Sequence, residues 1–165
     1  MNIFSKAITF LIIYSGLYFG IELANWTFLI FLFGTNETIL QNMELAFWAY
    51  LITNIVEYLV IKRKRQERNF WYSRLFSNVL VPWLIVIIWS VLPGIAGTLG
   101  PVWFETSWNV FVAFITGLFV IIVERVKYKF SFSFRVVIVV LFLVSLFFFI
   151  TISSGNQNLY IFKIS

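Results

Sequence analysis

The chain has 165 residues, of which 61% are hydrophobic, 21% are aromatic and only 12% are charged. Soluble domains are about 45–50% apolar and about 25% charged, so this chain has more apolar surface than one small aqueous core can bury. It contains no cysteine, histidine or aspartate. That composition excludes disulfides, Cys/His zinc sites and the Ser-His-Asp or Cys-His groups of many hydrolases.

Five apolar stretches are long enough to cross the hydrocarbon core of a bilayer, which takes about 20 helical residues. In chain order they are predicted at residues 7–24, 45–61, 70–92, 102–123 and 134–152. The predicted fold is therefore an all-α membrane protein, a five-transmembrane-helix bundle that forms a single integral membrane domain over residues 1–165.

The first stretch follows Lys6, as the apolar part of a signal peptide would, but no A-x-A-like cleavage site comes after it. We therefore predict a retained helix. The apolar segment 27–33 is too short to cross a bilayer alone, and it is either a re-entrant loop or an extension of a tilted first helix. Asn36 is predicted to cap the start of the second helix.

The basic residues set the orientation. Eleven of the twelve lie on one side of a five-helix arrangement, and only Lys163 lies on the other. The positive-inside rule makes the basic side cytoplasmic, with the N-terminus inside and the C-terminus outside a cell membrane. The basic loops are predicted to contact anionic lipid headgroups, at about 1 kcal/mol per residue. Nucleic acid is not an expected partner, because the basic run 62–68 is short and close to the membrane.

A group of polar residues is predicted near the outer face: Glu22, Glu37, Gln41, Glu44 and Glu105. The middle three are three or four residues apart and share one helical face, and a carboxylate at the start of the fourth helix is stabilised by the helix dipole. Converging, these groups would bind a hard cation or a cationic solute. The preferred interpretation is that they are solvated carboxylates, and no cofactor or bound metal is predicted.

Two polar pairs are predicted within the membrane. If the loop between the second and third helices is centred near Gln66, Glu57 and Arg74 lie at equal depth, as do Asn54 and Asn78. We expect a Glu57–Arg74 ion pair and an Asn54–Asn78 hydrogen bond, because unpaired charges in lipid are costly. The pairs form either a structural latch, which is preferred, or part of a proton or ion path.

Small residues recur every fourth position on two predicted helices, where they would let helix backbones approach closely in lipid. They are Gly16, Gly20 and Ala24 on the first helix and Ala113 and Gly117 on the fourth. Packing within one bundle is preferred over dimerisation, although a homo-oligomer or a protein partner stays open. The fifth helix, rich in Phe, Val and Leu, is expected at the lipid-facing periphery.

Residues 36–38 (Asn-Glu-Thr) resemble the N-E-S/T motif that opens the second helix in a family of small prokaryotic multi-pass membrane proteins, a domain of unknown function. Residues 56–58 (Val-Glu-Tyr) are similar to a later I-E-Y pattern, and the aromatic start of the third helix and the loop 93–97 are also similar. The resemblance covers roughly residues 20–125 and implies the fold rather than an activity. Where the family carries a Glu-His pair, this chain has Gln41 and Asn42, which do not titrate.

Three functions follow as hypotheses. The leading one is a non-enzymatic accessory or interaction subunit, since most catalytic side-chain combinations are missing. The second is a small transporter or channel for a cation or small solute, which predicts that Glu22 and Glu57 face a shared cavity. The third is a membrane-embedded enzyme that modifies lipid. An accessory role predicts no such cavity, with aromatic or small-residue stripes facing lipid.

Overall fold

A computed structural model describes residues 1–24, 39–60, 70–97, 101–126 and 131–154, and the structural statements below concern these residues. They form five helices: α1 (Ile3–Ala24), α3 (Ile39–Val60), α4 (Phe70–Ala96), α5 (Val102–Arg125) and α6 (Phe132–Ser154). Each helix is long and apolar enough to cross a membrane. The predicted all-α fold with five membrane-spanning helices is confirmed.

Several helices extend beyond the predicted stretches. Helix α1 begins at Ile3 and α3 at Ile39, whereas α4 continues through Pro93 to Ala96. The amide of Gly97 then donates to the Pro93 carbonyl at 2.9 Å, and its φ of 76° is the left-handed conformation that glycine adopts at helix ends. For α1 and α3, hydropathy marks only the apolar part of the helix, because the polar residues near its start continue the same hydrogen-bonding pattern. The loop expected at residues 93–97 is instead helical as far as Ala96. Segment 27–33 and Asn36 lie outside the described residues.

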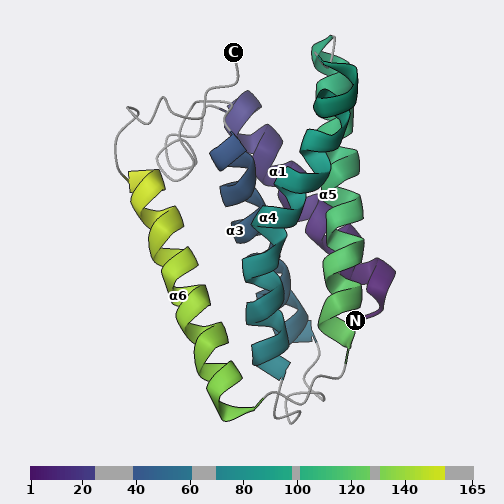
Figure 1. The fold of residues 1–165 in the computed structure, drawn as a ribbon. Coiled ribbons are helices and arrows are strands. Elements are labelled where there is room, and N and C mark those ends of the chain that lie inside the picture. Colours follow the sequence, from purple (N-terminus) through teal and green to yellow (C-terminus); the bar gives the residue numbers. More distant parts are fainter. Residues whose placement is uncertain (25–38, 61–69, 98–100, 127–130, 155–165) are drawn as a thin grey trace.

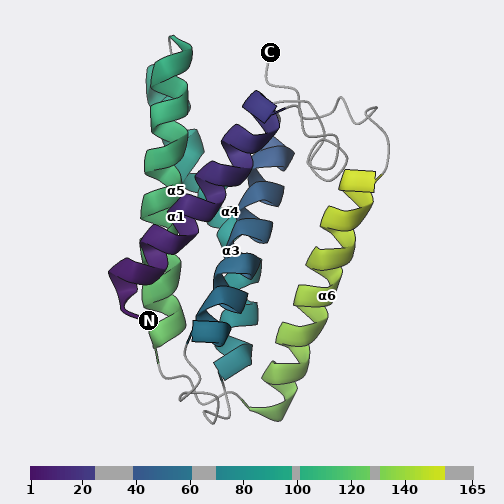
Figure 2. The ribbon, with the colours of Figure 1, turned by 180° about the vertical axis from the view of Figure 1, so that it is seen from behind.

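Helices α1, α3, α4 and α5 form a four-helix group in which each contacts two others: α1 packs on α3 and α5, and α4 packs on the same two helices. Figures 1 and 2 show α1 running obliquely across this group. Helix α4 bends midway along its length (Figure 1), near Pro82, which lacks the amide that would bond to the carbonyl of Asn78. The group encloses a core with both apolar and polar side chains.

Helix α6 lies apart from the four-helix group and packs mainly on α4 (Figures 1 and 2). Aromatic rings join it to α3, where Phe47 stacks on Phe142 with centroids 5.8 Å apart and meets Phe149 at 4.9 Å. Phe134 meets Phe76 of α4 with centroids 6.2 Å apart, whereas other rings of α6, such as Phe147 at 73% exposure, face outward. The peripheral position predicted for this last helix is confirmed.

We expect Phe142→Ala to weaken the docking of α6 by about 0.5–1.5 kcal/mol, the contribution of one aromatic pair. Phe147→Ala, on the exposed side of the same helix, is the matched control and should leave stability unchanged. Proteolysis at the α5–α6 connection of the protein in nanodiscs measures docking. Equal cleavage rates for the two variants would contradict the stacked pair as the anchor of α6.

The small residues of α1 and those of α5 differ in how closely they pack against a neighbouring helix. Ala113 and Gly117 of α5 are buried, and a Cβ added to Gly117 would lie 2.6 Å from Phe10 Cδ1 of α1. Gly16 instead is exposed, with nothing within 4 Å of an added Cβ, so the preferred prediction that it packs closely within the bundle is wrong. The reason is rotational: α1 turns the face with Phe10 inward, and Gly16 lies six residues away, about 120° from that direction. Gly20 is half-buried, and the side chain of Ala24 lies outside the described residues.

Candidate functional site

Four helices bring charged side chains together at the end of the bundle where α1 begins. Lys6 comes from α1, Glu57 from α3, Arg74 from α4 and Glu124 from α5. The hydroxyl of Tyr50, on the inward face of α3, joins them. We call these five residues the charged layer.

Lys6 is at the centre of the charged layer. Its Nζ donates to Glu57 Oε2 at 2.6 Å and lies 2.7 Å from both carboxylate oxygens of Glu124. Arg74 makes a second link between the same two acids, with Nε 3.0 Å from Glu57 Oε2 and a terminal nitrogen 3.4 Å from Glu124 Oε1. Tyr50 donates to Glu124 Oε2 at 2.6 Å. Each carboxylate therefore contacts both cations.

The electrostatic balance of the charged layer explains how it is tolerated inside a membrane protein. Lys6 is fully buried and the side chain of Glu57 is 3% exposed, while Arg74 retains 14%. Isolated charges at such positions are expensive, but two cations facing two anions at hydrogen-bond distance leave little net charge. Arg74 also stacks on the ring of Phe70 at 3.5 Å and donates to its carbonyl. The chain's amino group lies 3.9 Å from Glu57 Oε1.

Only part of this layer follows from the sequence reasoning above. The Glu57–Arg74 ion pair is present as the equal depth of the two residues predicts. The sequence indicates for Lys6 only a role in orientation or at the start of a signal peptide, and it marks neither Tyr50 nor Glu124 as a site residue. A signal was available, because five alternating helices place residues 6 and 124 at the same end of the bundle as the Glu57–Arg74 pair.

The predicted Asn54–Asn78 hydrogen bond is wrong. Both residues are buried, but neither polar atom of the Asn78 side chain bonds to any described residue. Equal depth is not sufficient here, because a bond between two short side chains also needs both helices to be rotated so that the side chains point at each other, whereas the longer Glu57 and Arg74 side chains can reach each other from a wider range of rotations. Within the described residues, other buried oxygens in this core also lack a hydrogen-bond partner: those of the Asn54, Ser77 and Thr116 side chains.

The predicted outer polar site is only partly described. Glu44 is buried on α3, Gln41 is half-buried on the same helix, and Glu105 is half-buried in the first turn of α5. Glu37 and the side chain of Glu22 lie outside the described residues. Within the described part of the chain, no three acidic residues gather as a cation site would require. Glu57 faces Lys6 and Arg74 rather than an open cavity, so that part of the shared-cavity expectation is wrong.

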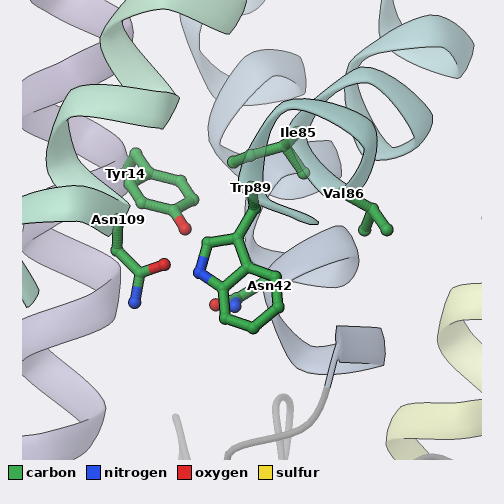
Figure 3. Close-up of a pocket in the computed structure, with 6 residues that line it drawn as sticks. All are labelled: Tyr14, Asn42, Ile85, Val86, Trp89 and Asn109. Carbon is green, nitrogen blue, oxygen red and sulfur yellow. The ribbon is translucent and has the colours of Figure 1, made fainter. Parts of the chain in front are cut away.

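A small pocket lies in the same four-helix group, toward the end of the bundle away from the charged layer. Its lining comes from all four helices: Tyr14, Asn42, Ile85, Val86, Trp89 and Asn109. Figure 3 shows the Tyr14 hydroxyl, the Trp89 indole nitrogen and the Asn109 carboxamide pointing toward the same space. We call these six residues the polar pocket.

Comparisons of this chain with protein-family models, with curated proteins and with solved structures found no match. The resemblance to a family of small prokaryotic membrane proteins therefore stays a prediction.

Proposed function

We propose that this multi-pass membrane protein is a non-enzymatic transporter or channel that carries a cation or small solute through the centre of its four-helix group. The observation that carries the proposal is the polar content of the core. It includes the four charged side chains of the charged layer, together with buried amide and hydroxyl groups that lack partners among the described residues. Ionisable residues inside membranes are costly, and they typically mark ion or substrate pathways.

The unsatisfied groups lie next to the charged layer along the inward faces of the helices. Asn54 precedes Glu57 by three residues, and Ser77 and Asn78 follow Arg74 by three and four. More than 90% of buried polar groups in proteins have a hydrogen-bond partner, so a cluster of exceptions indicates water or a transported species. These groups support a water-containing segment of the proposed path, which leads from the charged layer toward the middle of the bundle.

An apolar barrier then separates the charged layer from the polar pocket. The Phe10 ring is fully buried against Gly117. Its centroid lies 5.6 Å from the ring of Tyr50, in the charged layer, and 6.0 Å from the ring of Tyr14, in the polar pocket. Apolar constrictions of this kind gate pores by excluding water. On this proposal the described structure is a closed state of the path, in which Glu57 contacts Lys6 and Arg74 and faces no open cavity.

The test uses purified protein in liposomes that enclose a pH-sensitive dye, with a potassium diffusion potential as the driving force. Phe10→Ala removes the barrier, and we expect protons to enter these vesicles faster than wild-type or protein-free vesicles. Adding Glu57→Gln to Phe10→Ala should return the rate to the protein-free level, because the path then lacks one of its two buried carboxylates.

Arg135→Gln combined with Phe10→Ala is the control, since Arg135 stacks on Tyr72 outside the charged layer. It should leave the raised rate unchanged. Folding of each variant is checked by its monodisperse elution in detergent. If folded Phe10→Ala vesicles leak no faster than protein-free ones, the proposed path does not exist.

The alternative, which the sequence alone favours, is an accessory or interaction subunit with the charged layer as a structural latch. The specific observation in its favour is the charge balance of Lys6 and Arg74 against Glu57 and Glu124. A latch predicts that Glu57→Gln lowers stability and that Phe10→Ala causes no leak. The liposome experiment therefore decides between the two functions.

The proposal includes the orientation expected from the positive-inside rule, with the charged layer near the cytoplasmic face of a cell membrane and the basic loops on anionic headgroups. Reporter tags at the two ends of the chain test this. Finding both tags in the same compartment would contradict the orientation.

A further inference from the structure

The size of the polar pocket limits what it can bind. Its cavity has room for about one water molecule, so a larger solute does not fit between the helices as they are packed. Small apolar cavities in proteins stay dry, whereas polar cavities hold water when it finds about two to four hydrogen-bond partners there. The side chains that line the pocket therefore decide whether it is occupied.

Each of the four helices contributes one polar side chain to the pocket. They are Tyr14 from α1, Asn42 from α3, Trp89 from α4 and Asn109 from α5. Figure 3 shows the Tyr14 hydroxyl and the Asn109 carboxamide on the side of Trp89 that carries the indole nitrogen. The indole only donates hydrogen bonds, whereas the phenol and the carboxamides can donate or accept. Water, which does both, therefore finds matching partners in this lining.

The indole nitrogen of Trp89 is the strongest sign that the pocket is occupied. It is buried and donates no hydrogen bond to any described residue, although more than about 90% of buried polar groups have a partner. The carbonyl of the same residue has one. Because Pro93 lacks the amide that would bond to this carbonyl, the carbonyl accepts instead from the Trp108 indole at 3.2 Å. A water oxygen in the pocket would supply the acceptor that the Trp89 indole lacks.

We propose that the polar pocket is a binding site for a single water molecule, which accepts a hydrogen bond from the Trp89 indole and bonds to the Tyr14 hydroxyl and the Asn109 carboxamide. Helices α1 and α4 both pack on α3 and α5, so they lie across the four-helix group from each other. The water connects Tyr14 of α1 to Trp89 of α4, at the end of the group away from the charged layer. This site goes beyond the transport function and does not depend on it.

The test is the transfer of magnetisation from water to tryptophan indole protons by the nuclear Overhauser effect. It is measured on the full-length protein in nanodiscs, with isotope-labelled tryptophan. The Trp89 indole proton should receive this transfer, because a bound water molecule lies beside it. The Trp108 indole proton should receive less, because its partner is a protein carbonyl. Absence of transfer to Trp89 in the wild-type protein would overturn the proposal.

Asn109→Leu distinguishes a bound water molecule from exchange through the hydroxyl proton of Tyr14, which would give the same signal. The variant keeps Tyr14 and removes one polar partner of the water, so the transfer to Trp89 should be lost. Ser107→Ala is the matched control on the same helix, because the exposed Ser107 hydroxyl donates to the carbonyl of Trp103, outside the pocket. It should leave the transfer unchanged.

Asn42→Leu removes the other carboxamide and should also abolish the transfer to Trp89, which keeps the proposal testable if Asn109→Leu does not fold. Wild-type positions of the other indole signals show that a variant is folded. Transfer that persists in the folded variants would overturn the proposal. Transfer that behaves as expected in a protein whose Phe10→Ala variant conducts nothing would support the water site and refute transport, so the two failures are distinguishable.

Discussion

Lys6→Met is expected to lower the free energy of unfolding by about 3–5 kcal/mol, the usual cost of removing one partner from a buried ion pair. The variant leaves Arg74 as the one cationic side chain of the charged layer, and it removes the ammonium that lies within 2.7 Å of both carboxylates. Unfolding by increasing mole fractions of a denaturing detergent, followed by circular dichroism, measures the loss.

Arg125→Met is the matched control. Arg125 is an exposed cation at the same end of the bundle, where it donates to the carbonyl of Met1, and exposed charges contribute about 0–1 kcal/mol. Adding Glu124→Gln to Lys6→Met restores the balance of one cation and one anion, so the double variant should be more stable than the sum of the two single losses predicts. Strict additivity would show that the charged layer is not one coupled network.

Gly117→Ala should cost about 1–3 kcal/mol, the range for inserting a methyl group into a filled core. The new Cβ would lie 2.6 Å from Phe10 Cδ1. The Phe10 ring has little room to move, because the rings of Tyr14 and Tyr50 lie close to it. The same detergent unfolding measures this loss.

Gly16→Ala, on α1, should not cause the loss of stability expected for Gly117→Ala on α5. It has open space around the added Cβ, and alanine is favoured over glycine in helices by about 0.5–1 kcal/mol, so stability should be unchanged or slightly higher. Combining Gly117→Ala with Phe10→Leu should recover part of the loss. Equal effects of Gly117→Ala and Gly16→Ala would contradict the close contact between α1 and α5.

Predicting which residues pair from their depth in the membrane succeeds for some pairs and fails for others, as two examples at the same interface show. Glu57 and Arg74 meet because their side chains are long and of opposite charge. Asn54 and Asn78 are buried at similar depth and form no bond to each other. Depth is a linear property of the chain, whereas contact between short side chains also depends on how each helix is rotated and how far apart the axes lie.

By itself the sequence determined that the chain forms five helices long and apolar enough to cross a membrane, because this follows from local runs of apolar residues. It did not determine which helices surround the core. Lys6 and Glu124 are 118 positions apart in the sequence. They form a hydrogen-bonded ion pair because α1 packs between α3 and α5. The polar pocket and the Phe10–Gly117 contact arise in the same way, since each combines side chains from helices whose rotation and crossing are fixed only by tertiary packing.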